Sequence, residues 1–550
     1  MKKNLSWYVK RLMKMSFIEI FFRIKESSLY FIDCLWFKGG WKNDGERTSV
    51  SIENIDDKLG KHLLSYKDDL INILPIPLEK SLPFDNSLFF KNVNIKNGFD
   101  LRLYWESQRF NQTILVALSS HRSENIIRIL DFWMKNNPPL KGCNYISTME
   151  CAIRCINLYA ALCIMKSKGF LSDELLQLST VFFNNNYRLI KHRISKFSSR
   201  GNHTLFEYAG LAICSKALSL PKKVYWVEKC LSEFDFQTNA DGSGIEQSTS
   251  YHLFNVEVAW LIQHHCCATH GFSSKLDKAI KFCSYFWQNN KIVRIGDSDS
   301  SVLFSRVFLI SQLSENMAPS KPVLNNNEAG IVLLKNKDAV AYFKYGQLGL
   351  PPLYGHGHYD FLAINLINSS GEAIIADSHT YLYNCEQRKE FRSSKYHSMP
   401  TYGDDDIKQG SAFSWDKNKT GELLHCKENF ISARYIRDDQ VEVIRSLYSA
   451  NGFFVLVDYI KGGTKEFSTN LLIKSKSVKV NFYTYSEQSG LSSIQSNTEL
   501  VDFSEHYGEI EPESVNRTWV ATLPKNRIVT VINLTNVAVL ESEILNLIIK

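Results

Sequence analysis

The first half of the chain has the hydrophobic spacing of helices. Apolar residues recur there at intervals of three and four, the period at which side chains share one face of a helix. Short polar turns containing Gly or Asn separate the segments. A train of such helices can close into a ring or stack as a solenoid, and the periodicity alone does not choose between these arrangements. We expect helices over 147–169, 172–194, 204–218, 251–271 and 276–290.

The pattern changes near residues 316–328. The stretch 317–330, MAPSKPVLNNNEAG, has the two prolines and three asparagines of a linker. Beyond it the apolar runs are short, rich in Val, Ile, Tyr and Phe, and bounded by turn residues. We expect strands over 330–335, 339–346, 361–367, 441–448, 453–460 and 527–534. The sequence therefore predicts an α+β multidomain chain, with an all-α half followed by a large antiparallel β domain of stacked sheets.

Composition places the chain among globular proteins. With 550 residues, 44% hydrophobic and 22% charged, it is too long for a single core and too apolar for disorder. The formal net charge of +7 suits an anionic polymer as ligand, and no nucleic-acid motif accompanies it. The 12 cysteines include no C-x-x-C pair and no repeated spacing, so we expect neither a zinc ribbon nor a disulfide framework.

The N-terminal segment carries charges that interrupt every apolar run, among them Lys10, Arg11, Lys14, Glu19 and Arg23. A signal peptide needs an uninterrupted apolar core, and no window of the chain looks apolar enough to cross a membrane. We therefore expect a cytoplasmic protein, with a periplasmic location or export by another route as the alternative. The segment fits an ordinary helix docked on its domain, or an amphipathic helix that makes peripheral contact with a membrane.

Candidate chemistry is densest over 354–384. His356 and His358 are two residues apart, so in an extended strand they point to the same face. Asp377 follows a second apolar strand, and His397 follows a polar stretch. His358, Asp377 and His397 would make a divalent-metal site, with zinc favoured by ligand type. The simpler interpretation is a pair of hydrogen-bonded surface histidines.

Three further stretches contain candidate residues. Asn202 and His203 lie at the start of a helical run, where free N–H groups favour anions, although Asn is also a common helix cap. Tyr251 begins another helix after a glycine-rich turn in which Glu246 and Gln247 could bind sugar hydroxyls or merely cap. The acidic turn 294–301 holds residues that could bind a cation, buttress a loop or serve as the paired carboxylates of a hydrolase: Asp297 and Asp299.

Read together, these stretches resemble the heparinase II/III-like and alginate-lyase group of polysaccharide lyases. The blocks that carry the resemblance occur in the family's order, from about residue 110 to the C-terminus: RGNHTLFEYAGLAI, DGSGIEQSTSYH, IGDSDS, HGHYDFLAINLINSSGEAIIADSHTYLYN and FRSSKYHS. The chain departs from the family where Ser378 and His379 follow Asp377, and where Ser398 and Met399 follow His397.

The resemblance implies an N-terminal (α/α) toroid followed by a C-terminal antiparallel β-sandwich. It implies a helical extension over 1–110, the toroid over 111–318 and the sandwich over 328–550. The implied substrate is an anionic, uronic-acid-containing polysaccharide or oligosaccharide, and the implied reaction is β-elimination. The resemblance extends to members that accompany surface-polysaccharide biosynthesis. The alternative is a glycan-binding accessory protein with altered chemistry on the same scaffold.

The resemblance also implies roles for single residues. Asn202 and His203 would neutralise the C5 carboxylate, Tyr251 would act at the leaving oxygen, and His356 would be the partner acid or base. His358, Asp377 and His397 would hold a structural zinc ion.

Overall fold

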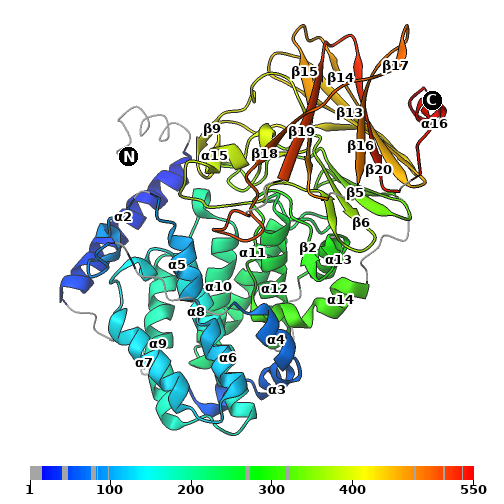
Figure 1. The fold of residues 1–550 in the computed structure, drawn as a ribbon. Helices are drawn as coiled ribbons and strands as arrows, with labels where there is room; N and C mark the ends of the chain where they lie inside the picture. Colours follow the sequence, from blue (N-terminus) through cyan, green and yellow to red (C-terminus); the bar gives the residue numbers. More distant parts are fainter. Residues whose placement is uncertain are drawn as a thin grey trace. The chain divides into compact units, whose positions relative to one another are not determined.

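The structure is a computed structural model that describes residues 15–39, 48–75, 82, 84–96, 98–266, 273–315, 323–475, 478–511, 515–535 and 537–549. The chain forms two compact units. The first comprises Met1–Phe234, Val258–Ser273 and Leu303–Val307, and the second comprises Asp235–Glu257, Ser274–Val302 and Phe308–Lys550. A helical N-terminal region is followed by C-terminal antiparallel sheets, as the sequence predicts (Figure 1).

The first unit is built from helices. They are α2 (Phe17–Gly39), α3 (Asp57–Ser65), α4 (Lys67–Ile73), α5 (Leu101–Ser107), α6 (Asn111–Ser119), α7 (Glu124–Asn136), α8 (Thr148–Ser167), α9 (Asp173–His192), α10 (Asn202–Ala217), most of α11 (Lys223–Gln237) and the end of α12 (Thr249–His265). The predicted helices 147–169, 172–194 and 204–218 correspond to α8, α9 and α10. Periodicity located these helices well because each is long and packs against neighbouring helices.

Helix α8 is the centre of this unit. It packs against α3, α6, α9 and α10. Gly60 of α3 and Gly210 of α10 allow close approach, since a Cβ on Gly60 would lie 2.0 Å from the carbonyl oxygen of Cys163 and a Cβ on Gly210 would lie 2.5 Å from Cβ of Ala152. Contrary to the sequence-based expectation, α8 is long and apolar enough to cross a membrane, and it is the one such helix among the described residues. Its apolar window is 100% buried within the unit, as expected for the central helix of a core.

The second unit contains two large antiparallel sheets. One has the order β11-β12-β13-β14-β20-β16-β17, and the other β18-β19-β15-β7-β6-β5-β4-β3 with β8 paired to β15. The first sheet comprises β11 (Glu422–Lys427), β12 (Phe430–Ile436), β13 (Glu442–Ala450), β14 (Phe453–Lys461), β16 (Lys479–Ser486), β17 (Gly490–Ser493) and β20 (Arg527–Asn533). The second comprises β3 (Val323–Asn326), β4 (Ile331–Lys335), β5 (Ala339–Lys344), β6 (Ile364–Asn368), β7 (Ala373–Ile375), β8 (Pro400–Thr401), β15 (Phe467–Ile473), β18 (Asn497–Val501) and β19 (Val515–Thr522).

The two sheets share one hydrophobic core. Buried side chains of both contribute to it, including Val332 and Phe343 from one sheet and Leu447 and Leu456 from the other. Alternation along the strands places these residues on the inner faces, which is the packing of a β-sandwich. The unit also contains the hairpins β1 (Trp287–Gln288)–β2 (Lys291–Ile292) and β9 (Gln409–Ser411)–β10 (Ser414–Trp415), and the helices α13 (Leu276–Tyr285), α14 (Ile310–Glu315), α15 (Arg388–Phe391) and α16 (Glu541–Ile548).

The compact units do not divide at the predicted linker or at residue 110. Residues 235–257 and 274–302 belong to the second unit although they precede the sheets. Thr249 N–H donates to the carbonyl of Ile295, and Asp297 N–H donates to the carbonyl of His356, which joins these segments to the β region. Part of the predicted linker is the strand β3, while residues 316–322 lie outside the described part of the chain.

Three predicted element boundaries also differ from the structure. The strand expected over 361–367 begins at Ile364, because Asp360–Ala363 form a turn whose N–H groups bond outside the ladder. The helix expected over 276–290 ends at Tyr285, since β1 follows at once. The helix expected over 251–271 spans Thr249–His265. Turn geometry, which apolar spacing does not encode, decides the first two boundaries, whereas residues 267–272, which include the end of the third expected helix, lie outside the described part of the chain.

Candidate active site

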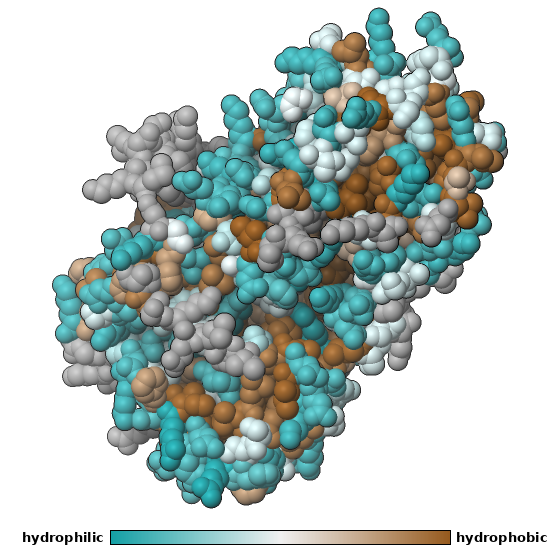
Figure 2. Space-filling view, in the orientation of Figure 1, coloured by the Kyte–Doolittle hydropathy of each residue, from teal (hydrophilic) through white to brown (hydrophobic). Residues whose placement is uncertain are grey.

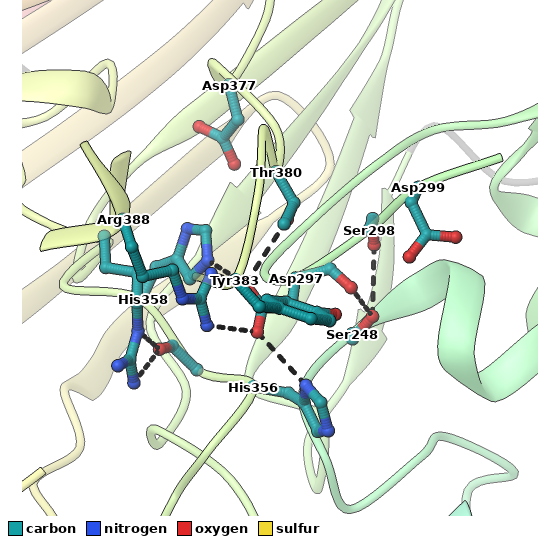
Figure 3. Close-up of polar contacts among 12 residues, drawn as sticks. Ser248, Asp297, Ser298, Asp299, His356, His358, Asp377, Thr380, Tyr383 and Arg388 are labelled. Carbon is teal, nitrogen blue, oxygen red and sulfur yellow. Dashed lines mark hydrogen bonds and ion pairs between the residues drawn. The ribbon is translucent and has the colours of Figure 1, made fainter. Parts of the chain in front are cut away.

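The carboxylate of Asp297 lies at the centre of a polar cluster in the second unit (Figure 3). Its Oδ1 accepts hydrogen bonds from His358 Nε2 at 2.8 Å and from Thr380 Oγ1 at 3.3 Å. Its Oδ2 lies 3.1 Å from His356 Nδ1. Arg388 binds both oxygens through its two terminal nitrogens. The Asp297 side chain is fully buried, so these neighbours replace the water that it loses on folding.

Gly296 explains why Asp297 reaches this position. Its φ of +65° is a left-handed conformation that favours glycine. A Cβ on Gly296 would lie 2.2 Å from the carbonyl oxygen of Gln247 and 3.1 Å from that of His356. The acidic turn therefore passes between the turn before α12 and the His356 segment, with no room for a side chain. Ser248 Oγ fixes the same turn by donating to the carbonyl of Asp297 at 2.7 Å.

Asp297 is ionised despite its burial. Burial alone would raise its pKa, but the charge of Arg388 and the hydrogen bonds from His356 and His358 hold that pKa well below its usual range. Burial likewise opposes the charge of Arg388, and the neighbouring carboxylate outweighs this effect and raises the arginine's pKa. The result is a bidentate, charge-assisted ion pair with two histidines attached to it.

An ionised carboxylate can only accept hydrogen bonds, which fixes the tautomer of His356. Its Nδ1 must carry the proton that is donated to Asp297, so in the neutral ring Nε2 holds the lone pair. This Nε2 lies 4.0 Å from Glu246 Oε1. The imidazole is partly exposed, unlike the other histidine on Asp297. His356 is therefore an oriented imidazole whose outer nitrogen can accept or deliver a proton.

Tyr251 lies beside this imidazole. The ring centroids of Tyr251 and His356 are 4.3 Å apart, and their planes are tilted by 35°. The tyrosine is in the first turn of α12, where its N–H donates to Ser248 Oγ at 3.3 Å. Its hydroxyl lies 2.5 Å from the hydroxyl of Tyr383. The structure thus places two proton-transfer groups, a phenol and an imidazole, next to each other.

Arg388 and two aromatic rings border this pair. The guanidinium carbon of Arg388 lies 4.9 Å from the centre of the Tyr383 ring and 5.6 Å from that of Phe413. Phe413 also packs edge-on against His356, with centroids 6.0 Å apart. The same guanidinium is paired with the Asp297 carboxylate. Tyr383, whose hydroxyl bonds to that of Tyr251, therefore links Tyr251 to the Asp297–Arg388 ion pair.

The residues predicted as zinc ligands lie next to the cluster. His358 and His397 are buried, with ring centroids 5.2 Å apart. His397 Nδ1 contacts Asp377 Oδ1 at 3.0 Å. Burial lowers the pKa of His358 to about 3 despite its bond to Asp297, whereas Asp377 outweighs burial at His397 and raises that pKa. Two ring nitrogens, His358 Nδ1 and His397 Nε2, are buried without a hydrogen-bond partner.

These donors fit zinc by type but are not arranged as a ligand set. In the described part of the chain, no group of three or more His, Cys, Asp or Glu side chains could hold a metal ion. Asp377 is directed to His397, and His358 turns its Nε2 to Asp297. The alternative expectation of a surface histidine pair is wrong for His358, which is buried against Asp297.

The remaining candidates are split between the two units. Glu246 and Gln247 are buried in the turn before α12, and Gln247 has a φ of +57°. Asp299 is buried too, and its N–H bonds to Ser250 Oγ at 2.8 Å, so it supports the same turn as Asp297. Asn202 and His203 belong to the first unit. Asn202 is the first residue of α10 rather than its cap, because Gly201 occupies the cap position.

Sequence reasoning missed Tyr383 and Arg388. Tyr383 lies at the end of the 354–384 stretch but is not among its candidate residues, and Arg388 lies in the polar stretch before His397. An arginine and a tyrosine so close to a dense cluster of histidines and carboxylates were the available signal. Asp297, which the sequence left unresolved, proves to be the residue that joins the histidines to Arg388.

Comparisons with known proteins agree with this architecture. Residues 318–531 match the family model described as "Heparinase II/III-like, C-terminal". A search of the curated proteins found no match. Among solved structures, a crystal structure of heparinase III is similar with a TM-score of 0.64 and 15% identity, over 90% of this chain and 88% of that one.

Two further structures have the same fold. A heparinase III gene product matches with a TM-score of 0.58 and 16% identity, over 88% of this chain and 86% of that one. The heparan sulfate lyase of Pedobacter heparinus matches with a TM-score of 0.51 and 16% identity, over 92% of this chain and 88% of that one. At such identities the likeness establishes a shared fold, and the predicted fold class is confirmed.

Proposed function

We propose that this chain, whose residues 318–531 form a heparinase II/III-like C-terminal domain, is a polysaccharide lyase that cleaves a uronic-acid-containing glycan by β-elimination. One observation carries the proposal. Tyr251 and His356 lie side by side, with ring centroids 4.3 Å apart, and Asp297 orients the imidazole. These groups can move two protons, one from carbon and one to a leaving oxygen, which is what an elimination requires.

The chemistry accounts for the residue types. In an elimination the C5 proton leaves, a double bond forms between C4 and C5, and the bond from C4 to its oxygen breaks. The leaving oxygen takes a proton. The carboxylate on C5 opposes the carbanion, so donors that hold its oxygens are each worth roughly 3 kcal/mol. That donor role for Asn202 and His203 stays a prediction from the family resemblance.

His356 and Tyr251 divide the two proton transfers in the proposed mechanism. Neutral His356 has its lone pair on Nε2, because Nδ1–H is donated to ionised Asp297. Should the ring become protonated, Asp297 stabilises the imidazolium. The hydroxyl of Tyr251 shares a hydrogen bond with the hydroxyl of Tyr383, in which either oxygen can be the donor. Both groups can therefore change protonation state without moving.

We also propose that His358, Asp377 and His397 hold a structural zinc ion. The support is the two buried ring nitrogens without a partner, His358 Nδ1 and His397 Nε2, and the carboxylate beside them. A bound ion would require rotation of these side chains away from their present arrangement. Its contribution would be stability of the His356 segment, since the elimination needs no metal-bound water.

Ultraviolet absorbance of the unsaturated product tests the proposed reaction. The panel contains heparan-type, hyaluronan-type and alginate polymers. Capsular polymers are included as well, because the resemblance extends to family members that accompany surface-polysaccharide biosynthesis. Wild type is compared with Tyr251→Phe, and Tyr225→Phe, an exposed tyrosine of α11, is the matched control. Absorbance should rise with wild type and the control only. Cleavage that leaves a saturated end would indicate a hydrolase, and binding without cleavage would indicate an accessory protein.

A further inference from the structure

Helix α2 carries apolar side chains on both its inner and its outer face. The inner face buries the carboxylates of Glu19 and Asp33, which are 8% and 1% exposed, and packs Phe22 and Phe37 against aromatic rings of the first unit. The outer face also holds large apolar side chains, with Phe17 92%, Phe21 73% and Phe31 67% exposed. A helix that docks on its domain ordinarily has a polar outer face.

The exposed residues form one continuous face. The successive residues of this face are three, four or seven positions apart, the spacing of one side of a helix: Phe17, Phe21, Ile24, Phe31 and Leu35. Ile18 and Ile32 extend this apolar face on one flank. An open groove of about 710 Å³ runs along it and is lined in part by Met15, Ile20 and Arg23. In Figure 1, α2 is the dark blue helix, and Figure 2 shows brown side chains among teal ones along it.

Basic side chains line the flank of α2. A cavity of about 80 Å³ is lined by Lys25 of α2 and by Lys191, Arg193 and Lys196 from the end of α9 and beyond. Its one carboxylate, Glu26, lies 2.8 Å from a guanidinium nitrogen of Arg23. The sequence immediately before α2 adds positive charge. Residues 1–14 contain only basic charged residues, namely Lys2, Lys3, Lys10, Arg11 and Lys14.

We propose that the outward face of α2 docks onto the surface of an anionic lipid bilayer. Phe17, Phe21 and Phe31 would enter the boundary between headgroups and acyl chains, while Lys25 and Lys191 contact lipid phosphates. An amphipathic helix with aromatic and aliphatic residues on one face and Lys or Arg beside them binds membranes in this way. Each basic residue near an anionic surface strengthens such binding by roughly fivefold.

Charge favours a bilayer over a second copy of the chain. In a twofold dimer the same face of both copies meets, so both basic flanks and both basic N-terminal sequences would be brought together. Against an anionic surface the same charges attract. The inference is independent of the proposed lyase activity, because α2 lies in the first unit and the Tyr251–His356 pair in the second.

Vesicle flotation with the full chain tests the proposal. The vesicles contain phosphatidylcholine alone or a mixture with phosphatidylglycerol. Wild type should float with the mixed vesicles, and added salt should weaken its binding. Phe21→Ser with Phe31→Ser should lower the partition coefficient by roughly tenfold or more. Lys25→Glu with Lys191→Glu should remove the preference for the anionic lipid.

The matched control is Phe132→Ser in α7, where another exposed phenylalanine, 70% exposed, lies outside this face. It should bind as wild type does, and melting curves should show all variants folded. Three results would overturn the proposal: no flotation of folded wild type, equal binding to neutral vesicles, or a stable dimer in ultracentrifugation that the Phe21 and Phe31 substitutions dissociate.

Discussion

The hydroxyl groups of Tyr251 and Tyr383 lie 2.5 Å apart, although the two residues are 132 positions apart in the chain. Either oxygen can be the donor. The guanidinium carbon of Arg388 lies 4.9 Å from the centre of the Tyr383 ring, and the same arginine pairs with Asp297. Tyr383 therefore connects Tyr251 to this ion pair, while Tyr251 itself lies beside His356.

Removing the hydroxyl of Tyr251 should slow the reaction more than removing the hydroxyl of Tyr383. Tyr251→Phe loses the group proposed to transfer a proton, so kcat should fall by roughly 10²–10⁴-fold. Tyr383→Phe removes only the partner, so the loss should be smaller and should appear in kcat rather than KM. The measurement is the initial rate of double-bond formation on the substrate found in the polymer panel. Equal losses in both variants would show that Tyr383 itself reacts.

Asp297→Asn tests the buried ion pair. The amide leaves Arg388 in the interior without its counter-charge, and breaking a buried pair in this way costs roughly 3–5 kcal/mol of unfolding free energy. Denaturant titration of wild type and Asp297→Asn measures this loss of unfolding free energy. The control is Asp438→Asn, which removes an exposed partner of Lys419 at 2.7 Å and should change stability by about 0–1 kcal/mol. A similar small effect of both substitutions would contradict an ionised Asp297.

The sandwich strands could be predicted because their residues follow a local rule. Phe453–Lys461 and Arg527–Asn533 lie within one residue of the predicted strands, since a short apolar run rich in Val, Ile and Phe and bounded by turn residues is visible in any short window. The cluster at Asp297 could not be predicted in the same way. Its contacts with His356 and His358 join residues 59 and 61 positions apart, and they depend on one glycine conformation at Gly296. No spacing along the chain encodes that approach.

The outer face of α2 shows a different limit. Apolar spacing correctly indicates a helix there, but it gives no information on which side faces the protein. The inner side contains Asp33, 3.8 Å from Arg193, together with Phe22 and Phe37, which pack on aromatic rings of the first unit. Because apolar residues lie on both sides of the helix, their spacing alone does not decide which side the protein covers.

Metal removal tests the proposed zinc ion. If His358, Asp377 and His397 hold it, the purified chain should contain about one zinc ion, and chelation should lower the melting temperature because structural metal stabilises the fold. His358→Ala should lower both metal content and melting temperature. His425→Ala, a histidine of β11 outside the cluster, is the control and should change neither. Wild type without metal, with a melting temperature insensitive to chelator, would remove the assignment.

Stability of the first unit should depend on pH through Glu207. Burial raises the pKa of this carboxyl from 4.5 to about 7, although Thr148 Oγ1 at 2.5 Å and Ser195 N–H at 2.6 Å donate to it and oppose the shift. A folded-state pKa above the unfolded value means that the folded state holds a proton which the unfolded chain releases. The resulting stabilisation is fully present below pH 4.5 and is lost as the pH rises through about 7.

The amplitude of this loss is on the order of 3 kcal/mol, at 1.36 kcal/mol per pKa unit. Unfolding free energy measured between pH 4 and 8 should fall more steeply with pH in wild type than in Glu207→Gln, because the amide has no proton to release in this range. Glu124→Gln, at an exposed position at the start of α7, should leave the slope unchanged. If the slopes of wild type and Glu207→Gln coincide, Glu207 is ionised in the folded chain and its three donors outweigh burial.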